Sequence, residues 1–466
     1  MGKLKLRGKD LIKLGFEQGP AVGLAIELIK KHYKYHTSDE VFELLGALAS
    51  QPEDFIKHPH FNKIAALLLP SEEPQKRLIP LRPNPEPYQV YGIENIEEGA
   101  QLQMRTAMRL PVSREGALMP DAHQGYGLPI GGVLAVENAV IPYGVGMDIG
   151  CRMCLSIYDI DPQVLNGKTQ QFKNALLDNT RFGFEAFEHP QDDPIFERSE
   201  FKTIKTVKSL KDKAWSQIGS SGSGNHFVEF GIVNISKEDK TLQVAPGQYL
   251  ALLSHSGSRG FGANLAQHYT KIAREQCLLP KEAQHLAWLD LASEAGQEYW
   301  LAMNLAGDYA SACHHQIHRK IGKHLGEQAI KVVENHHNFA WKEYIGDKEY
   351  IVHRKGATPA GKDVLGVIPG SMTAPAHIVK GLGALGALNS AAHGAGRRMS
   401  RRAAKASFTN SAFKKHLIKM GVSLIGAGLD ESPFAYKDIE EVMSHQKDLV
   451  LSLGTFTPKI VRMAKA

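Results

Sequence analysis

The sequence predicts an α+β protein in which helices surround mixed β-sheets, with a small helical segment in front of them. Three observations support this class. Beyond about residue 88, compact apolar and β-branched runs alternate with glycine-rich loops. Two long stretches with helical periodicity occur among these runs, without the regular strand–helix alternation of a doubly wound sheet. Hydrophobic residues make up 43% of the chain and charged residues 22%, which is ordinary for a globular protein with a substantial core.

The first part of the chain shows apolar residues at helical spacing, which predicts short helices between about residues 8 and 70. The periodic residues are Leu11, Leu14, Val22, Leu24, Ala25, Leu28 and Ile29, followed by Val41, Leu44, Leu45 and Leu48. A proline-rich run over residues 78–87 is typical of a linker. We therefore expect a helical N-terminal segment at 1–77, a linker at 78–87 and a main domain at 88–466.

Within the main domain, four short runs predict strands at residues 131–136, 154–158, 249–253 and 350–353. Helical periodicity predicts one helix over 261–277, a second over about 281–326, and a third beginning near Gly396 and continuing through Lys405. Histidine is abundant, with 21 copies in the chain. We expect some of these imidazoles to lie on helix surfaces, among them His314, His315 and His318 of the second helix.

The overall composition limits the classes of protein that the chain can belong to. A net charge of +6 and a pI near 8.9 fit an RNA or nucleotide partner, although many soluble enzymes are as basic. Four cysteines in so long a chain do not make a disulfide framework. The first residues lack the apolar core of a signal peptide, and no apolar run reaches membrane-spanning length. We therefore expect a cytoplasmic protein with no membrane contact.

Asp148 and Cys151 lie three residues apart in a turn that contains Gly146 and Gly150, so both side chains could meet one metal ion. A thiolate can also bridge two ions. The alternative interpretation pairs Cys151 with Cys154 as a redox or zinc Cys-x-x-Cys element, but a zinc knuckle needs a second pair at matching spacing, and none is present. From the pattern alone, a buried structural cysteine is as compatible as a ligand.

Further candidate ligands follow glycine-rich loops or strand ends. The loop 219–229 offers backbone N–H groups to phosphate oxygens and contains Asn225-His226. His255 ends an apolar run and precedes a Ser-Gly turn, where ligand sites often occur. Of the adjacent His336 and His337, only one is expected to face a given site, because neighbouring strand residues point in opposite directions. Each pattern also occurs in ordinary turns.

His393-Gly394-Ala395-Gly396-Arg397 is predicted to open a helix, where a histidine would lie beside free N–H groups and a positive helix end. A histidine in that position could attack or hold a phosphorus atom, while a capping turn is the alternative. Residues 369–373 could position a nucleotide or form a simple turn. Taken together, the residue types and spacings predict a two-metal site that activates phosphates.

A set of unusual motifs extends along the main domain. They lie at 119–125, 145–151, 224–227, 255–260, 337–338, 354–357, 369–372, 393–397 and 430–437. In residue type and order these motifs resemble those of the RtcB-type tRNA-splicing ligases, and the resemblance covers roughly residues 88–466. The resemblance implies that the domain at 88–466 is an RtcB-like ligase domain.

Members of this family join RNA ending in a 3′-phosphate or 2′,3′-cyclic phosphate to RNA with a 5′-hydroxyl, using GTP and Mn²⁺. The resemblance implies one Mn²⁺ held by Asp148, Cys151 and His226, and a second held by Cys151, His255 and His337. It also implies that His393 is the nucleophile that carries GMP. The implied nucleotide contacts are Asn225, His226, Phe227, Val228, Glu229, His337, Asn338, Pro369, Gly370, Ser371, Met372, His393, Gly394, Ala395, Gly396 and Lys465.

Three positions depart from the family pattern. Ala376 stands where the family usually has a hydroxyl-bearing residue, so one nucleotide hydrogen bond would be absent. Ala392 stands where many members have cysteine, which we expect to affect packing only. Lys465 is penultimate, as in the family, but its neighbours differ. The metal and nucleophile positions are intact, which argues against an inactive relative.

Two other functions remain open from the sequence, namely a metal-dependent RNA end-processing phosphodiesterase and a non-catalytic RNA-binding protein. A protein partner that activates the ligase is also compatible with the sequence. The stretch 14–23 is similar to a helical element in some tRNA nucleotidyltransferase tails, which suggests that the N-terminal segment contacts RNA. A small helical lid or a partner-docking module is the alternative for that segment.

Overall fold

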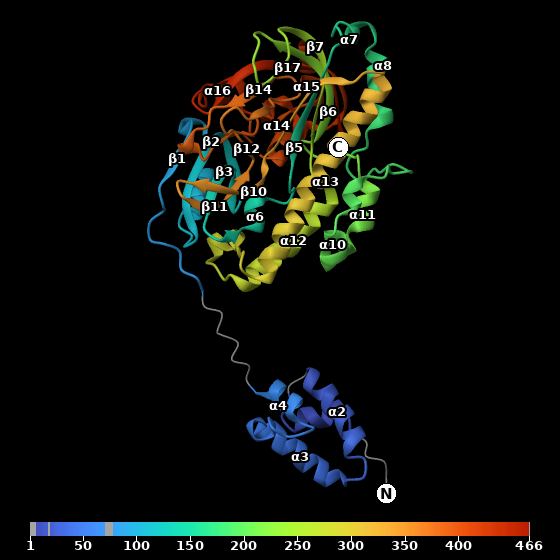
Figure 1. Cartoon of the computed structure of the whole chain (residues 1–466), viewed down its shortest axis with the longest axis vertical. Coiled ribbons are helices and arrows are strands. Elements are labelled where there is room, and N and C mark those ends of the chain that lie inside the picture. The colour runs from blue at the N-terminus through green and yellow to red at the C-terminus, as the bar shows by residue number, and fades with distance from the viewer. Residues whose placement is uncertain (1–5, 17–18, 70–77, 466) are drawn as a thin grey trace. The chain divides into compact units, whose positions relative to one another are not determined.

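The computed structural model describes residues 6–16, 19–69 and 78–465, and the chain separates into two compact units, Met1–Arg77 and Leu78–Ala466 (Figure 1). Residues 17 and 18 of the stretch 14–23 lie outside the described residues, as do residues 70–77. Each unit has its own buried apolar core. Together they contain helices and mixed sheets, which confirms the α+β prediction.

The smaller unit is helical, as the periodicity predicts. It consists of α1 (Gly8–Lys13), α2 (Pro20–His32), α3 (Ser38–Ser50) and α4 (Asn62–Leu68), with a 3₁₀ turn at Pro52–Phe55. A capping box begins α3, because the Thr37 hydroxyl accepts from the Glu40 N–H and the Glu40 carboxylate accepts from the Thr37 N–H. The apolar faces of these helices meet in one core that includes Leu11, Ile29 and Leu45.

The larger unit contains a five-stranded sheet with the strand order β1-β2-β3-β11-β10. The strands are β1 (Tyr88–Val90), β2 (Ser113–Tyr126), β3 (Leu128–Val136), β11 (Lys348–Lys355) and β10 (Asn338–Ile345). β1 pairs in parallel with β2, and the other pairs are antiparallel. The strands predicted at 131–136 and 350–353 lie in β3 and β11.

A second sheet has the strand order β13-β14-β17-β6-β7-β5-β9, with β16 paired in parallel to β17. Its strands are β13 (Leu365–Ile368), β14 (Ala376–Gly381), β17 (Val450–Lys465), β6 (Phe227–Ile235), β7 (Gly247–Ser256), β5 (Arg152–Tyr158), β9 (Ala329–His336) and β16 (Ser423–Ala427). The strands predicted at 154–158 and 249–253 are β5 and β7. Two small pairs complete the β-structure, β12 (Ala357–Pro359) with β15 (Ser390–Ala392), and β4 (Ala139–Val140) with β8 (Leu289–Asp290).

Helices cover the sheets of this unit, and the two longest are α12 (Arg259–Gln276) and α13 (Glu294–Leu325), which pack against each other (Figure 1). The others are α5 (Glu98–Ala107), α6 (Pro142–Val145), α7 (Val164–Gly167), α8 (Thr169–Asn179), α9 (Glu200–Thr203), α10 (Lys205–Ser209), α11 (Lys211–Gln217), α14 (Arg401–Ser407), α15 (Asn410–Met420) and α16 (Ile439–Ser444). The helix predicted at 261–277 corresponds to α12. Among the described residues, no helix combines the length and the hydropathy that a membrane crossing requires.

Two predicted helix starts are wrong. α13 begins at Glu294 rather than near residue 281, because Leu289 and Asp290 pair with β4 and the Ser293 side chain caps the helix. Similarly, α14 begins at Arg401 rather than near Gly396, because Gly396 has a left-handed φ of 70° and the Ser400 hydroxyl accepts the Ala403 N–H. His393 therefore follows strand β15 and does not lie at a helix N-terminus.

The surface positions predicted for two histidines of α13 are also wrong. His314 is fully buried and His318 is 7% exposed, because both lie on the side of the helix that packs against β5 and β7. His315, in contrast, is exposed as predicted.

The proline-rich stretch 78–87 belongs to the larger unit and is hydrogen bonded to the rest of it. The Ile79 N–H donates to the Leu278 carbonyl at 2.8 Å, and the Arg82 N–H donates to the Arg109 carbonyl at 2.8 Å. The Arg82 guanidinium also donates to the carbonyls of Pro111 and Ser113. These bonds pair N–H groups of the stretch with carbonyl groups elsewhere in the unit, so the stretch is held in place.

Candidate functional site

A cavity of about 1060 Å³ lies in the larger unit, and both large sheets contribute to its lining. The five-stranded sheet contributes Tyr126 and Lys355, and the eight-stranded sheet contributes Phe227, His255 and Ala376. All five side chains predicted to bind metal line this cavity, together with His393. Segments separated by up to 245 residues in sequence, from Asp148 to His393, therefore meet in one place.

The predicted metal-binding side chains approach one another closely. The Cys151 Sγ lies 3.4 Å from the His226 Nε2 and 3.2 Å from the His255 Nε2. The His255 Nε2 in turn lies 3.2 Å from the His337 Nε2, and the His226 Nε2 lies 3.0 Å from an Asp148 oxygen. Two groups of possible ligand atoms result, Asp148–Cys151–His226 and Cys151–His255–His337, and they share the Cys151 sulfur.

Local structure explains why these side chains converge. Cys151 immediately precedes β5, His255 lies in β7, and these strands pair in antiparallel register with Met153 opposite His255. His337 lies between β9 and β10, and its N–H donates to the Cys151 carbonyl at 2.9 Å. Its neighbour His336 packs against Phe339 and Trp341 instead, so only one imidazole of the pair reaches the site, as predicted.

The electrostatics of this cluster suit a bound cation. Burial raises the pKa of the Cys151 thiol well above its usual value, and the negative charge of Asp148 raises it further. Burial would also raise the pKa of Asp148, but the hydrogen bond and charge of His226, with Cys151 and His255, together hold it below its usual value. Burial lowers the pKa of His255 to about 3, so its imidazole is neutral and able to ligate a metal.

Hydrogen bonds orient the imidazoles of this cluster. The His255 Nδ1 is 3.0 Å from the Asn225 carbonyl, and the Ser258 N–H donates to Asp148 at 3.0 Å. The Nδ1 atoms of His226 and His337 are buried and have no hydrogen-bond partner among the described residues. The Nε2 atoms of the same two rings face the thiol, the carboxylate and the third imidazole, and this set of converging donor atoms fits a site for transition-metal ions.

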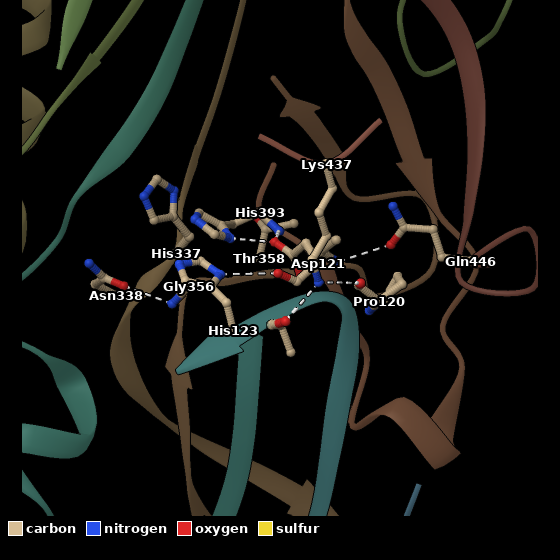
Figure 2. Close-up of polar contacts among 12 residues, drawn as sticks. Pro120, Asp121, His123, His337, Asn338, Gly356, Thr358, His393, Lys437 and Gln446 are labelled. Carbon is tan, nitrogen blue, oxygen red and sulfur yellow. Dashed lines mark hydrogen bonds and ion pairs between the residues drawn. The ribbon is translucent and has the colours of Figure 1, made fainter. Parts of the chain in front are cut away.

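The second feature of the cavity is the contact between His393 and Asp121, shown in Figure 2. The His393 Nδ1 lies 2.6 Å from an Asp121 oxygen, and the His393 backbone N–H donates to the same oxygen at 3.2 Å. Asp121 is completely buried in β2, and its other carboxylate oxygen has no hydrogen-bond partner among the described residues. The His393 and His337 rings have centroids 5.0 Å apart, so His393 is adjacent to the metal-binding cluster.

Sequence reasoning assigned no role to Asp121, although the motif at residues 119–125 contains it. An aspartate in an apolar strand is the signal that could have identified it, because a buried carboxylate needs a partner. The surrounding backbone is held in place by Lys437, whose ammonium donates to the carbonyls of Pro120 and Ala122 (Figure 2). The partner of Asp121 is 272 residues away in sequence, so the pairing itself could not be predicted.

All the predicted nucleotide-contacting residues line the cavity except Val228 and Lys465. Val228 is fully buried and packs in the core behind β6, because strand neighbours point to opposite faces and Phe227 and Glu229 face the cavity. Lys465 is exposed at the end of β17. Ala376 lines the cavity where a hydroxyl was expected in the family.

Further ionisable groups line the cavity, among them three guanidinium groups and one buried carboxyl group. Arg398, Arg401 and Arg402 lie in and before α14, and Arg401 pairs with Glu431 at 3.1 Å while remaining half exposed. Glu229 is 3% exposed, and burial raises the pKa of its carboxyl well above the usual value. The cavity thus combines a cluster of possible metal ligands, an oriented histidine, a buried carboxyl group and several guanidinium groups. Such a combination can bind and activate phosphate esters.

Comparison with known proteins agrees with this chemistry. The sequence model of the family described as tRNA-splicing ligase RtcB matches residues 103–204 and 187–464. The chain is 31% identical to the RNA-splicing ligase RtcB of Escherichia coli strain K12 over 386 residues, which cover 76% of this chain and 91% of that protein. It is 30% identical to the tRNA-splicing ligase RtcB of Thermococcus kodakarensis, over 75% of this chain and 88% of that protein. With a family match over most of its length and the motif residues gathered in one cavity, the chain belongs to the RtcB family of ligases.

Proposed function

We propose that the protein is an RNA ligase that uses GTP and Mn²⁺ to join RNA 3′-phosphate or 2′,3′-cyclic phosphate ends to 5′-hydroxyl ends. It would act in tRNA splicing or RNA repair in the cytoplasm. The observation that carries this proposal is the placement of His393 beside the Asp148, Cys151, His226, His255 and His337 cluster in one cavity. The similarity to proteins named RNA-splicing ligase in Escherichia coli and tRNA-splicing ligase in Thermococcus kodakarensis supports it.

The donor set supports two ions that share the Cys151 sulfur. Asp148 and His226 would complete one site, and His255 and His337 the other. When bound, Mn²⁺ would neutralise phosphate charge and polarise the phosphorus–oxygen bonds. Carboxylate oxygen suits manganese, whereas imidazole and thiolate suit several transition ions, so the choice of manganese rests on the family resemblance.

His393 is suited to nucleophilic attack through its Nε2. Asp121 holds the Nδ1, which places the ring proton there and leaves a lone pair on Nε2. We propose that the Nε2 attacks the α-phosphorus of GTP, so that a nitrogen–phosphorus bond forms as the bond to pyrophosphate breaks. GMP would then pass to the RNA 3′-phosphate, and the 5′-hydroxyl would displace GMP to form the phosphodiester. A cyclic phosphate would first be opened to a 3′-phosphate by water.

The selection of guanine over adenine would depend on Glu229. Burial raises the pKa of Glu229, and the two donors of guanine, its ring N1–H and its exocyclic amine, would stabilise the ionised carboxylate on binding, whereas adenine presents no such pair of donors. A site built around that pair would disfavour ATP, because the carboxylate would then be left without its partners. Phe227, Asn225, Asn338 and residues 369–372 and 394–396 supply the remaining surface for the nucleotide.

The test is covalent labelling with α-labelled GTP in the presence of Mn²⁺. The intact protein should become labelled, and His393→Ala should abolish the label because the attacking nitrogen is gone. His324→Ala is the matched control, since His324 is exposed in the last turn of α13. Label retained by the His393→Ala protein, or absent from the intact protein with every divalent metal and nucleotide tried, would refute the proposal.

Two further observations separate the alternatives from the ligase. An end-processing phosphodiesterase would open cyclic phosphates to 3′-phosphate RNA without needing GTP. A non-catalytic RNA-binding protein would catalyse no reaction, so Cys151→Ala would change only its RNA binding. The cluster of possible ligands around Cys151 disfavours the non-catalytic protein. The oriented His393 beside that cluster favours the ligase over the phosphodiesterase, which needs no histidine nucleophile for GMP. A protein that accelerates the labelling step would be the activating partner that the sequence leaves open.

We also propose that the helical N-terminal segment, residues 1–77, contacts the RNA, with 78–87 as its connection to the ligase domain at 88–466. The supporting feature is a surface formed by two stretches without acidic residues, Lys30–His36 and Lys57–His60. The His32 and His60 rings stack at 4.2 Å, and the Lys34 ammonium lies 4.7 Å from the centre of the Tyr35 ring, which is 76% exposed. Exposed aromatic rings among lysines are suited to bases and phosphates.

This second proposal predicts that Lys30→Glu, Lys31→Glu and Lys34→Glu together weaken RNA binding and flatten its salt dependence. Lys9→Glu with Lys13→Glu, in α1 of the same unit, is the control for a general change of charge. Equal loss of affinity in both variants would contradict a localised RNA surface. The N-terminal segment would then act as a lid or as a partner-docking module.

A further inference from the structure

A second cysteine–histidine cluster lies outside the catalytic cavity and shares no residue with it. The Cys154 Sγ and one ring nitrogen each of His314 and His318 lie within 4.8 Å of one another. Cys154 and His314 are fully buried, and His318 is 7% exposed. None of the three lines the cavity.

The cluster lies on the reverse face of the strands that carry the catalytic residues. In the antiparallel pair of β5 and β7, Met153 is opposite His255, whereas Cys154 is opposite Ser254. Because successive strand residues point to opposite faces, Cys154 and Ser254 face away from the cavity side occupied by His255. α13 packs against this face, and its residues His314 and His318 are four apart, on one side of the helix.

Hydrogen bonds already orient the two imidazoles. The Ser254 hydroxyl lies 2.6 Å from the His314 Nδ1 and 2.7 Å from the His318 Nε2. The Ser156 hydroxyl lies 2.7 Å from the His318 Nδ1. Among the described residues, however, the His314 Nε2 has no hydrogen-bond partner, and Cys154 makes no side-chain hydrogen bond. A network of serines and histidines alone therefore does not account for the thiol or for this buried nitrogen.

We propose that Cys154, His314 and His318 form a second metal site, which holds a zinc-type transition ion, with the Ser254 hydroxyl or a water as the remaining ligand. One sulfur and two imidazole nitrogens are a donor set that such ions prefer, and serine hydroxyls beside the imidazoles supply the outer hydrogen bonds that ligating histidines usually have. Since its three ligands are buried and none of them lines the catalytic cavity, the site has a structural role.

The charges around the cluster are compatible with a cation. Burial lowers the pKa of His318 to about 3 and that of His314 well below its usual value, so both rings are neutral and can ligate. Arg152, which lowers the pKa of His314 further, is paired with Glu334 at 3.2 Å. Binding of the ion would convert the Cys154 thiol to a thiolate, releasing one proton to solvent as the metal–sulfur bond forms.

Such an ion would link α13 to β5 through Cys154, which lies three residues after the catalytic-site residue Cys151. The same connection would reach β7 through Ser254, whose neighbour is His255. Occupancy of the second site would thereby hold in place the strands that present the catalytic ligands. This expectation does not depend on whether the proposed ligase activity is correct.

The experiment uses Co²⁺, whose bond to a thiolate gives a charge-transfer absorption in the near ultraviolet. The full chain carrying Cys151→Ala removes the catalytic thiolate, so any remaining absorption must come from another cysteine. We expect this protein to bind Co²⁺ with thiolate absorption equivalent to about one sulfur per chain, and Zn²⁺ to displace it. Adding Cys154→Ala should abolish the absorption, whereas adding Cys313→Ala, which removes a buried cysteine of α13, should leave it intact.

His318→Asn in the Cys151→Ala background provides a second variant, because asparagine can still bond to the serines but is a poor ligand. We expect it to weaken Co²⁺ binding at least tenfold, and Zn²⁺ to raise the melting temperature of the Cys151→Ala protein but not that of the His318→Asn derivative. The proposal is overturned if the Cys151→Ala protein shows no thiolate absorption. It is equally overturned if the absorption survives loss of Cys154, or if Zn²⁺ stabilises the His318→Asn derivative as strongly.

Discussion

His393 presents two ring nitrogens with different surroundings. The Nδ1 lies 2.6 Å from the fully buried Asp121 carboxylate, whereas the Nε2 makes no hydrogen bond within the described part of the chain. A buried carboxylate without solvent is a strong acceptor, so it fixes both the orientation of the ring and the position of its proton. Asp121 acts through His393 and is in this sense a positioning residue.

Asp121→Asn should therefore slow labelling by GTP at least about a hundredfold. The asparagine amide would donate to Nδ1 and move the ring proton to Nε2, where it blocks attack. The measurement is the rate of labelling across a range of pH, together with the content of bound metal. Unchanged metal content with a slower rate supports the positioning role, whereas loss of metal in the variant would mean that Asp121 only supports the structure.

A second prediction at this scale concerns His353, a fully buried residue of β11 whose Nε2 accepts the Ile141 N–H at 2.9 Å. Burial lowers the pKa of His353 to about 4. An unfolded histidine has a pKa near 6.5, so below that pH the unfolded state binds a proton that the folded state does not. Stability is therefore lost as the pH falls from about 7 towards 4, by about 2 kcal/mol from this group at pH 5.

His353→Gln keeps an acceptor oxygen for the Ile141 N–H but cannot titrate. Its free energy of unfolding by denaturant should fall by about 2 kcal/mol less than that of the unchanged protein between pH 7 and pH 5. His324→Gln, at an exposed position, is the control and should leave the pH dependence unchanged. Parallel pH profiles for all three proteins would show that His353 is not the titrating group.

At the scale of elements, the loop between β15 and α14 determines where His393 lies. Gly396 is left-handed at φ 70°, and a Cβ there would lie 2.1 Å from the Asp121 carbonyl oxygen. The backbone of this loop therefore packs directly on β2, and the Ala395 N–H donates to the Pro369 carbonyl at 2.9 Å. Close backbone approach without a side chain is what allows Asp121 to reach His393.

Gly396→Ala should displace the loop for two reasons. Alanine is strained in the left-handed conformation, and its Cβ would clash with the Asp121 carbonyl of β2. We expect a loss of at least about 1–3 kcal/mol in stability and a large loss of GTP labelling. Gly346→Ala is the matched control, since Gly346 is also left-handed at φ 61° but a Cβ there meets nothing within 4 Å. Equal effects of the two substitutions on labelling would mean that the contact with β2 is unimportant.

At the scale of the whole molecule, the chain contains two units with separate cores. The smaller core includes Leu45 and Phe61, and the larger unit has five clusters of its own. Residues 78–87 are hydrogen bonded to the rest of the larger unit, so a chain that begins at residue 78 keeps those contacts. The division therefore predicts that each unit folds without the other.

A shortened chain of residues 78–466 should unfold cooperatively and keep its labelling by GTP within about twofold, because every residue of the cavity lies in the larger unit. Its RNA affinity should fall if the smaller unit contacts RNA as proposed. Calorimetry and the labelling assay measure the two properties. An insoluble or unlabelled shortened chain would show that the larger unit depends on the smaller one.

The sequence by itself determined the fold class, the strands at β3, β5, β7 and β11, and the motifs that identify the family. These features depend on local patterns, because β-branched runs, helical spacing and glycine-rich loops act over a few residues. The sequence also identified the candidate ligands Asp148, Cys151, His226, His255 and His337, and the family resemblance implied which of them share each metal ion. Their convergence at the Cys151 sulfur is a property of the tertiary structure.

Only the tertiary structure decided three features. These are the contact between His393 and Asp121 across 272 residues, the start of α14 at Arg401, and the burial of His314 and His318 beside Cys154. The physical reason is common to all three. Which face of a strand or helix is covered, and where a loop can approach another backbone, depends on contacts between distant segments, and these contacts override the local preference of each residue.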